Sequence, residues 1–119
     1  MGRILIADDE INILGVLTEV LENAGHEVVG APDGNEALFQ LQSKKFDVAL
    51  LDVMMPKIDG YHLAQAIHSL PQPPKIIIMT SRDFDGDQQA LVGTGALAFL
   101  SKPFSNKDVL EAVSKLLIA

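Results

Sequence analysis

The clearest information about the fold of this 119-residue chain comes from the stretch FDVALLD, residues 46–52. Residues 48–51 of this stretch are all apolar, which is typical of a strand that is covered on both faces, as in a parallel sheet. Comparable short apolar stretches recur along the chain. We therefore expect strands at residues 3–7, 27–31, 46–51, 75–80 and 98–101.

Amphipathic stretches separate the expected strands, and each of them predicts a helix. We expect five helices, which run from Ile11 to just before Gly25, from Asp33 past Leu41, over about residues 61–70, over residues 87–92, and through Val109–Leu117. A strict alternation of strands and helices indicates a parallel sheet, and right-handed crossovers place helices on both of its faces. The predicted fold is a doubly wound α/β sandwich that forms one domain over residues 1–119.

The composition limits what the chain can do. Hydrophobic residues make up 48% of it, which is enough for a core, and the absence of cysteine excludes disulfides, thiolate metal sites and a catalytic thiol. The formal net charge is -7, so we expect this domain to bind neither nucleic acid nor an anionic membrane. Residues 1–10 lack the features of a secretory signal, and every apolar run is far shorter than the ~20 residues that span a bilayer. We therefore expect a cytoplasmic location.

Polar residues follow four of the five expected strands directly. Because the carboxyl ends of parallel strands meet at one edge of a sheet, we expect these side chains to converge there. They are Asp8, Asp9 and Glu10 after the first strand, Asp52 after the third, Thr80 and Ser81 after the fourth, and Lys102 after the fifth.

This set of side chains favours one kind of chemistry. Carboxylates that are held close together repel each other, so they need a nearby cation or a raised pKa. Oxygen ligands without cysteine or histidine suit Mg²⁺. A carboxylate can also attack phosphorus as a nucleophile, and Lys102 and Thr80 could supply an ammonium and a hydroxyl to the phosphoryl oxygens. The edge of the sheet thus fits Mg²⁺-assisted transfer of a phosphoryl group to a carboxylate.

Several motifs occur in order along the chain: ILIADDE at 4–10, LDVMMP at 51–56 followed by Asp59-Gly60, IMTS at 78–81, GA at 95–96 and FLSKPF at 99–104. With these motifs the chain resembles the receiver domains of two-component response regulators over essentially its whole length, in the form of a single domain similar to a chemotaxis regulator. The resemblance implies a flavodoxin-like fold with a five-stranded parallel sheet, in the order 2-1-3-4-5, and five helices.

The resemblance also implies roles for the converging residues. Asp52 would be the phosphoacceptor, and a histidine kinase or a phosphotransfer protein would supply the phosphoryl group. Asp9, Asp52 and the backbone carbonyl of Met54 would hold Mg²⁺, with Asp8 acting through water. Lys102 would pair with the phosphoryl group.

A conformational switch is a further implication of the resemblance. Thr80 and Phe99 would form the switch pair, in which the hydroxyl moves toward the phosphoryl group and the aromatic ring turns inward. The peptide bond before Pro103 would be cis. The surface of helix four, strand five and helix five would contact an unknown downstream target or effector domain, and phosphorylation-dependent homodimerisation stays open. Such a domain catalyses its own phosphorylation and slow dephosphorylation and is not a turnover enzyme.

Two other classes of protein share parts of this pattern. A phosphatase similar to the haloacid dehalogenases would pass through an aspartyl phosphate, but it needs a second acid two residues after the nucleophile, where this chain has Met54. A flavodoxin-like binder of a flavin or nucleotide needs a loop of Gly, Ser or Thr after the first strand. There, Asp8-Asp9-Glu10 would repel a phosphate unless a metal intervened.

Overall fold

The computed structural model describes residues 2–55, 57–81 and 93–118. Its elements are β1 (Arg3–Ala7), α1 (Ile11–Asn23), β2 (Glu27–Ala31), α2 (Gly34–Ser43), β3 (Val48–Asp52), α3 (Gly60–His68), β4 (Lys75–Thr80), β5 (Ala98–Ser101) and α5 (Asn106–Ile118). The helix expected over residues 87–92 lies outside the described residues, so the described part holds four helices against the five expected. None of these helices combines the length and the apolar character needed to cross a bilayer.

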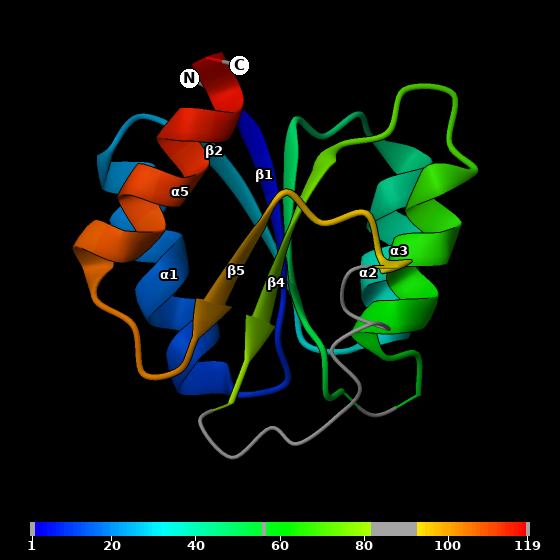
Figure 1. The fold of residues 1–119 in the computed structure, drawn as a ribbon, viewed down its shortest axis with the longest axis horizontal. Coiled ribbons are helices and arrows are strands. Elements are labelled where there is room, and N and C mark those ends of the chain that lie inside the picture. Colours follow the sequence, from blue (N-terminus) through cyan, green and yellow to red (C-terminus); the bar gives the residue numbers. More distant parts are fainter. Residues whose placement is uncertain (1, 56, 82–92, 119) are drawn as a thin grey trace.

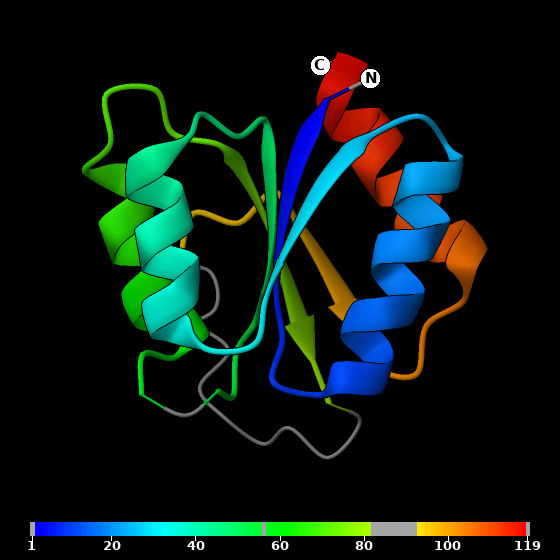
Figure 2. The same ribbon diagram turned by 180° about the vertical axis from the view of Figure 1, so that it is seen from behind.

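The strands form one parallel sheet in the order β2-β1-β3-β4-β5, which confirms the predicted topology. The helices form a layer on each face of it, with α1 and α5 on one face and α2 and α3 on the other (Figures 1 and 2). The first crossover, from β1 to β2, leads to one edge of the sheet, and the next, from β2 to β3, returns past β1 to its other side. This reversal brings the carboxyl ends of β1 and β3 side by side, where open α/β sheets bind their ligands.

Two apolar cores hold the layers together, because successive side chains of a strand point to opposite faces of the sheet. Leu50 packs with the residues of α1 and α5, whereas Leu51, the next residue, packs with those of α2 and α3. All five residues of β3 are buried, which explains why this strand has almost no polar residue in the sequence. β3, the central strand of the sheet, therefore ends with a buried carboxylate, that of Asp52.

Two glycines allow close contacts that hold the loop after β3 against its neighbours. A Cβ atom on Gly34, at the start of α2, would overlap the backbone carbonyl of Ile58. A Cβ atom on Gly60, at the start of α3, would lie 2.7 Å from the carbonyl oxygen of Asp52. Only glycine can occupy such positions without moving the backbone, so both residues help to fix the position of the segment that follows Asp52.

Candidate functional site

Three carboxylates meet at the carboxyl edge of the sheet. Asp8 follows β1 and Asp52 ends β3, and these strands are paired with Ala7 opposite Leu51. Asp8 is 0% exposed and Asp52 is 5% exposed, whereas Glu10, at the start of α1, lies at the surface. One oxygen of each of the three side chains lies within 4.8 Å of the others. The predicted convergence of Asp8 and Asp52 is thus present in the fold.

Lys102 places one positive charge among these carboxylates. Its Nζ atom lies 2.8 Å from Oδ2 of Asp8, 3.1 Å from Oε1 of Glu10 and 3.3 Å from Oδ2 of Asp52. Its backbone N–H donates to the carbonyl of Thr80 at 2.7 Å, which fixes the start of the loop after β5. The Lys102–Pro103 peptide bond is cis, as the family resemblance implies.

One buried oxygen of this cluster lacks a hydrogen bond. Oδ1 of Asp8 accepts from the backbone N–H of Glu10, and Oδ1 of Asp52 accepts from that of Met54. Oδ2 of Asp8 has no such hydrogen bond among the described residues and lies in an ion pair, 2.8 Å from Nζ of Lys102. In the part of the chain that the structure describes, three carboxylates with only one lysine among them leave an excess of negative charge, which fits a divalent cation that prefers oxygen ligands.

The surroundings shift the pKa values of two groups in opposite ways. Burial is the largest influence on Asp52 and raises its pKa to about 6. The charge of Asp8 adds to this rise, while the N–H of Met54 and the ammonium of Lys102 oppose it. Burial alone would lower the pKa of Lys102, but the adjacent carboxylates of Asp8 and Asp52 outweigh it and hold that pKa above its usual range. At neutral pH the Asp52 carboxylate is therefore ionised and Lys102 is protonated.

Other predicted site residues lie near this cluster without joining it. Asp9 is exposed and does not belong to the carboxylate group that the described residues form. Thr80 is buried at the end of β4, and its hydroxyl lies 3.5 Å from that of Ser101. Phe99, on β5, is 46% exposed, so its ring lies at the surface. Glu10, which was expected at this edge without a role of its own, contacts Lys102.

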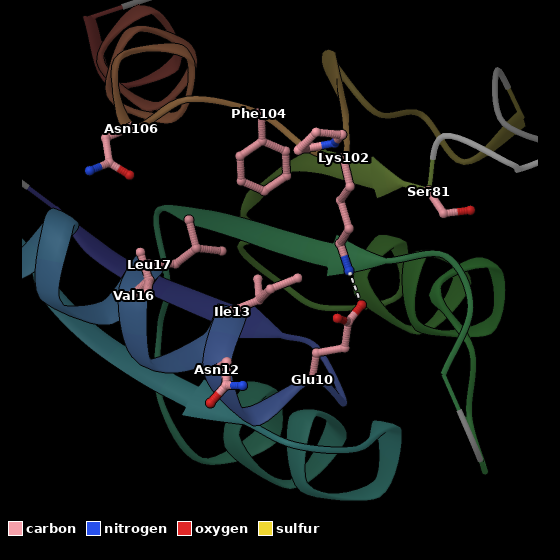
Figure 3. A pocket seen from close by; sticks show the side chains of 10 residues that line it. Glu10, Asn12, Ile13, Val16, Leu17, Ser81, Lys102, Phe104 and Asn106 are labelled. Carbon is pink, nitrogen blue, oxygen red and sulfur yellow. Dashed lines mark hydrogen bonds and ion pairs between the residues drawn. The ribbon is translucent and has the colours of Figure 1, made fainter.

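A pocket of about 450 Å³ adjoins the cluster, between α1 and the loop that leads from β5 to α5. Figure 3 shows Glu10 and Lys102 meeting at one end of it, with Ile13, Leu17 and Phe104 along its apolar wall. Glu10 and Lys102 thus belong both to the carboxylate cluster and to the lining of this pocket.

The fold and the site together define a small doubly wound α/β domain with an acidic site and one lysine at its topological switch point. A family model for the response regulator receiver domain matches residues 4–114, and the chain belongs to this family. The family acts in two-component signalling, and its members are generally not turnover enzymes. Receiver domains interact with histidine kinases and with downstream effector domains.

Individual relatives agree with this assignment. The chain is 35% identical to the alkaline phosphatase synthesis transcriptional regulatory protein PhoP of Bacillus subtilis, over 97% of this chain and 48% of that protein. It is 44% identical to the probable transcriptional regulator ycf27 of Galdieria sulphuraria, over 92% of this chain and 42% of that protein. The chain thus spans about half the length of the curated relatives it matches.

Solved structures are similar over nearly their full length. A putative response regulator from Chloroflexus aurantiacus matches with a TM-score of 0.90 and 32% identity, over 99% of this chain and 98% of that one. The chemotaxis response regulator CheY4 of Vibrio cholerae matches with a TM-score of 0.89 and 32% identity, over 98% of each chain. These likenesses and the family model support the receiver domain over the phosphatase and the flavin or nucleotide binder.

Proposed function

We propose that this receiver domain accepts a phosphoryl group on the carboxylate of Asp52, from a histidine kinase or a phosphotransfer protein, and then changes conformation to control a partner or an effector domain. The observation that carries this proposal is the contact of Lys102 with Asp52, in which an ammonium lies 3.3 Å from the oxygen of a nearly buried carboxylate. A cytoplasmic location, and no contact of this domain with nucleic acid or a membrane, belong to the same proposal.

The two oxygens of Asp52 have different surroundings, which suits a nucleophile. Oδ1 accepts a hydrogen bond from the Met54 N–H, which orients the carboxylate, and Oδ2 faces Lys102. In the proposed reaction an oxygen of Asp52 forms a bond to phosphorus, the bond from phosphorus to the donor breaks, and its electron pair leaves with the donor group. Lys102 balances the negative charge on the phosphoryl oxygens.

Mg²⁺ is the proposed cofactor, and when bound it would neutralise charge on the transferred phosphoryl group. The carboxylates of Asp8 and Asp52 fit such an ion, because Oδ2 of Asp8 is buried and lacks a hydrogen bond among the described residues. By resemblance, Asp9 and the carbonyl of Met54 would complete the ligand set, with Asp8 acting through water.

Substitution of Asp9 tests this ligand set. We expect Asp9→Ala to weaken Mg²⁺ binding at least about tenfold, because a lost carboxylate ligand removes both a bond and a charge. Calorimetric titration with MgCl₂ is suitable, since the chain has no tryptophan to report binding by fluorescence. Glu22→Ala, at the far end of α1, removes an exposed acid and should leave the affinity unchanged. Equal affinities of Asp9→Ala and the wild type would exclude Asp9 from the ligands.

Thr80 and Phe99 are the proposed switch pair. The Thr80 hydroxyl lies beside Ser101 and the Phe99 ring is 46% exposed, which suits a resting state in which the ring has not turned inward. Leu97, just before β5, is also exposed, so this edge of the sheet offers apolar surface to a partner. The proposed output surface comprises β5, α5 and residues 87–92, and the last of these lie outside the described residues.

A phosphorylation assay tests the proposed acceptor. Wild-type protein, incubated with a small phosphodonor and Mg²⁺, should gain the mass of one phosphoryl group, and this gain should be stable to acid and labile to alkali. Asp52→Asn should show none. Asp33→Asn is the matched control, because the same change at the N-cap of α2 keeps a good capping residue and should leave labelling intact. If Asp52→Asn took up the same phosphoryl group, Asp52 would not be the acceptor.

A further inference from the structure

Glu10 is the exposed partner of Lys102. Its side chain is 60% exposed, whereas Asp8 and Asp52, the other two partners, are buried and oriented by backbone N–H groups. The Glu10 side chain makes no capping hydrogen bond to α1, although Glu10 occupies the N-cap position. Besides its place in the carboxylate cluster, this side chain contacts Lys102.

The same contact lies at the end of the pocket beside the carboxylates (Figure 3). Of the described residues that line this pocket, Glu10 and Lys102 alone are charged, and in the ion pair their charges cancel. When Lys102 turns to a phosphoryl group, the negative charge of Glu10 loses its partner and remains at the pocket. A reactant that carries much negative charge would then meet a repulsive group.

We propose, on the basis of the acceptor function proposed for Asp52, that Glu10 is a positioning residue that selects phosphodonors by charge. It holds Lys102 in the resting site and competes with the phosphoryl oxygens for the ammonium. Its exposed charge also disfavours small dianionic donors relative to donors with less negative charge. Glu10 thus lowers phosphorylation by anionic metabolites that carry an activated phosphoryl group, without contacting the reacting atoms itself.

Acetyl phosphate and phosphoramidate are suitable probes, because the first is a dianion near neutral pH and the second a monoanion. With acetyl phosphate, an oxygen of Asp52 bonds to phosphorus, the phosphorus–oxygen bond to the acetyl group breaks, and acetate leaves with the electron pair. With phosphoramidate, the phosphorus–nitrogen bond breaks, and the protonated nitrogen leaves as ammonia. Both reactions give the same aspartyl phosphate. Because the donors also differ in their leaving groups, the effect of Glu10 is the change in the ratio of their rate constants between a variant and the wild type.

The experiment measures these two rate constants by mass spectrometry at saturating Mg²⁺, for wild type, Glu10→Gln, Glu10→Asp and Glu22→Gln. We expect Glu10→Gln to raise the rate constant with acetyl phosphate roughly threefold, because one exposed negative charge near the reactant is removed. The increase with phosphoramidate should be clearly smaller. Added KCl should reduce this difference by screening. Glu10→Asp keeps the charge and should keep the wild-type ratio. Glu22→Gln, at the other end of α1, should match the wild type.

The outcomes separate the two proposals. If neither donor labels the wild type, the acceptor function itself fails. If the wild type is labelled and Glu10→Gln leaves the ratio of rate constants unchanged, the role of Glu10 alone is overturned. A parallel Mg²⁺ titration covers the remaining alternative. Slower labelling by both donors with weakened Mg²⁺ affinity would make Glu10 a metal ligand, and would overturn donor selection by charge.

Discussion

The side chain of Asp52 is nearly buried and still carries a negative charge at neutral pH. Its pKa is set by burial and by the groups around it. The Met54 N–H and the Lys102 ammonium stabilise the charged form, but burial and the neighbouring Asp8 outweigh them, so the pKa rises to about 6. The carboxylate is ionised at neutral pH although little water reaches it. Such a group is a better nucleophile than a solvated carboxylate, and it also lowers the stability of the metal-free protein.

The difference in free energy of unfolding between Asp52→Asn and the wild type measures this loss of stability. The pKa of about 6 in the folded protein lies above the ordinary value of 3.8, so the folded state binds the proton more tightly. The resulting stabilisation is complete below the ordinary pKa and is lost as the pH rises through about 6. In metal-free buffer we expect Asp52→Asn to exceed the wild type in free energy of unfolding by about 2 kcal/mol at pH ~7.5, and to match it below pH ~4.

Urea titrations followed by circular dichroism give these free energies at both pH values. Asp33→Asn serves as the control, because the pKa of Asp33 is lowered, chiefly by the backbone N–H of Glu36, and loss of that charge should bring no gain. A wild type that is more stable than Asp52→Asn at the higher pH would contradict the assigned electrostatics.

Sequence reasoning predicted the residues of the site better than their contacts. Asp8, Asp52 and Lys102 follow buried strands, so their convergence is a consequence of the parallel topology. Asp8 directly follows β1 and is buried, whereas Asp9 lies in the bend before α1 and is exposed, so their different exposure depends on the conformation of this loop. The contact of Glu10 with Lys102 depends on side-chain rotamers across two loops, which no spacing in the sequence encodes.

At the level of the elements, the ends of the helices fix the loops that surround the site. Asp33 caps α2 by accepting from the Glu36 N–H, and the adjacent Gly34 lets the loop after β3 approach α2. Lys57, in that loop, has a positive φ of 71°, and its Nζ atom lies 3.5 Å from Oδ2 of Asp33. The segment between Asp52 and α3 is therefore held by packing and by its backbone conformation as well as by its ends.

A pair of glycine substitutions tests this constraint. We expect Gly34→Ala to lower the free energy of unfolding by about 2 kcal/mol or more, because its Cβ would overlap the Ile58 carbonyl and the backbone would have to move. Gly15→Ala is the matched control, since a Cβ at that helical position meets nothing within 4 Å. That variant should gain about 0.5–1 kcal/mol from helix propensity. Thermal or urea unfolding measures both changes, and a neutral Gly34→Ala would contradict the described close approach.

The start of α5 shows what the apolar pattern misses at this scale. The apolar stripe of this helix starts at Val109, whereas the helix itself begins at Asn106. The Ser105 hydroxyl accepts from the Asp108 N–H, and the Asp108 carboxylate accepts from the Ser105 N–H. This reciprocal cap stabilises a first turn made of polar residues. Capping depends on hydrogen bonds and not on an apolar face, so the apolar stripe does not reveal this first turn. The spacing of Ser105 and Asp108, three residues apart, is the feature of the sequence that indicates the cap.

In the whole molecule, one sheet separates two cores, and adjacent residues of a strand serve different ones. On β4, Ile77 packs with α1 and α5, and Ile78 packs with α2 and α3; both side chains are fully buried. The alternation of strands and helices in the sequence was sufficient to predict this architecture, because a parallel sheet needs crossover helices and covers both faces. Because the strands contribute to both cores, lost packing on either face also affects the sheet.

Truncations on the two faces should therefore destabilise the same folded state. We expect Ile77→Ala and Ile78→Ala each to lower the free energy of unfolding by about 3 kcal/mol, in a single transition with an unchanged dependence on urea. Val16→Ala, at a half-exposed position of α1, should cost less than about 0.5 kcal/mol. Urea unfolding followed by circular dichroism gives these values, and separate transitions for the two variants would show that the layers unfold independently.

The most direct measurement for the central proposal identifies the residue that carries the phosphoryl group. Wild-type protein would be labelled with phosphoramidate and Mg²⁺ and then reduced with borohydride, which converts a phosphorylated aspartate into homoserine. Peptide sequencing by mass spectrometry then gives its position. We expect homoserine at position 52 and unmodified aspartate at Asp8 and Asp9. Homoserine at either of those two positions, or at no position in a protein that has gained the phosphoryl mass, would contradict the proposed acceptor.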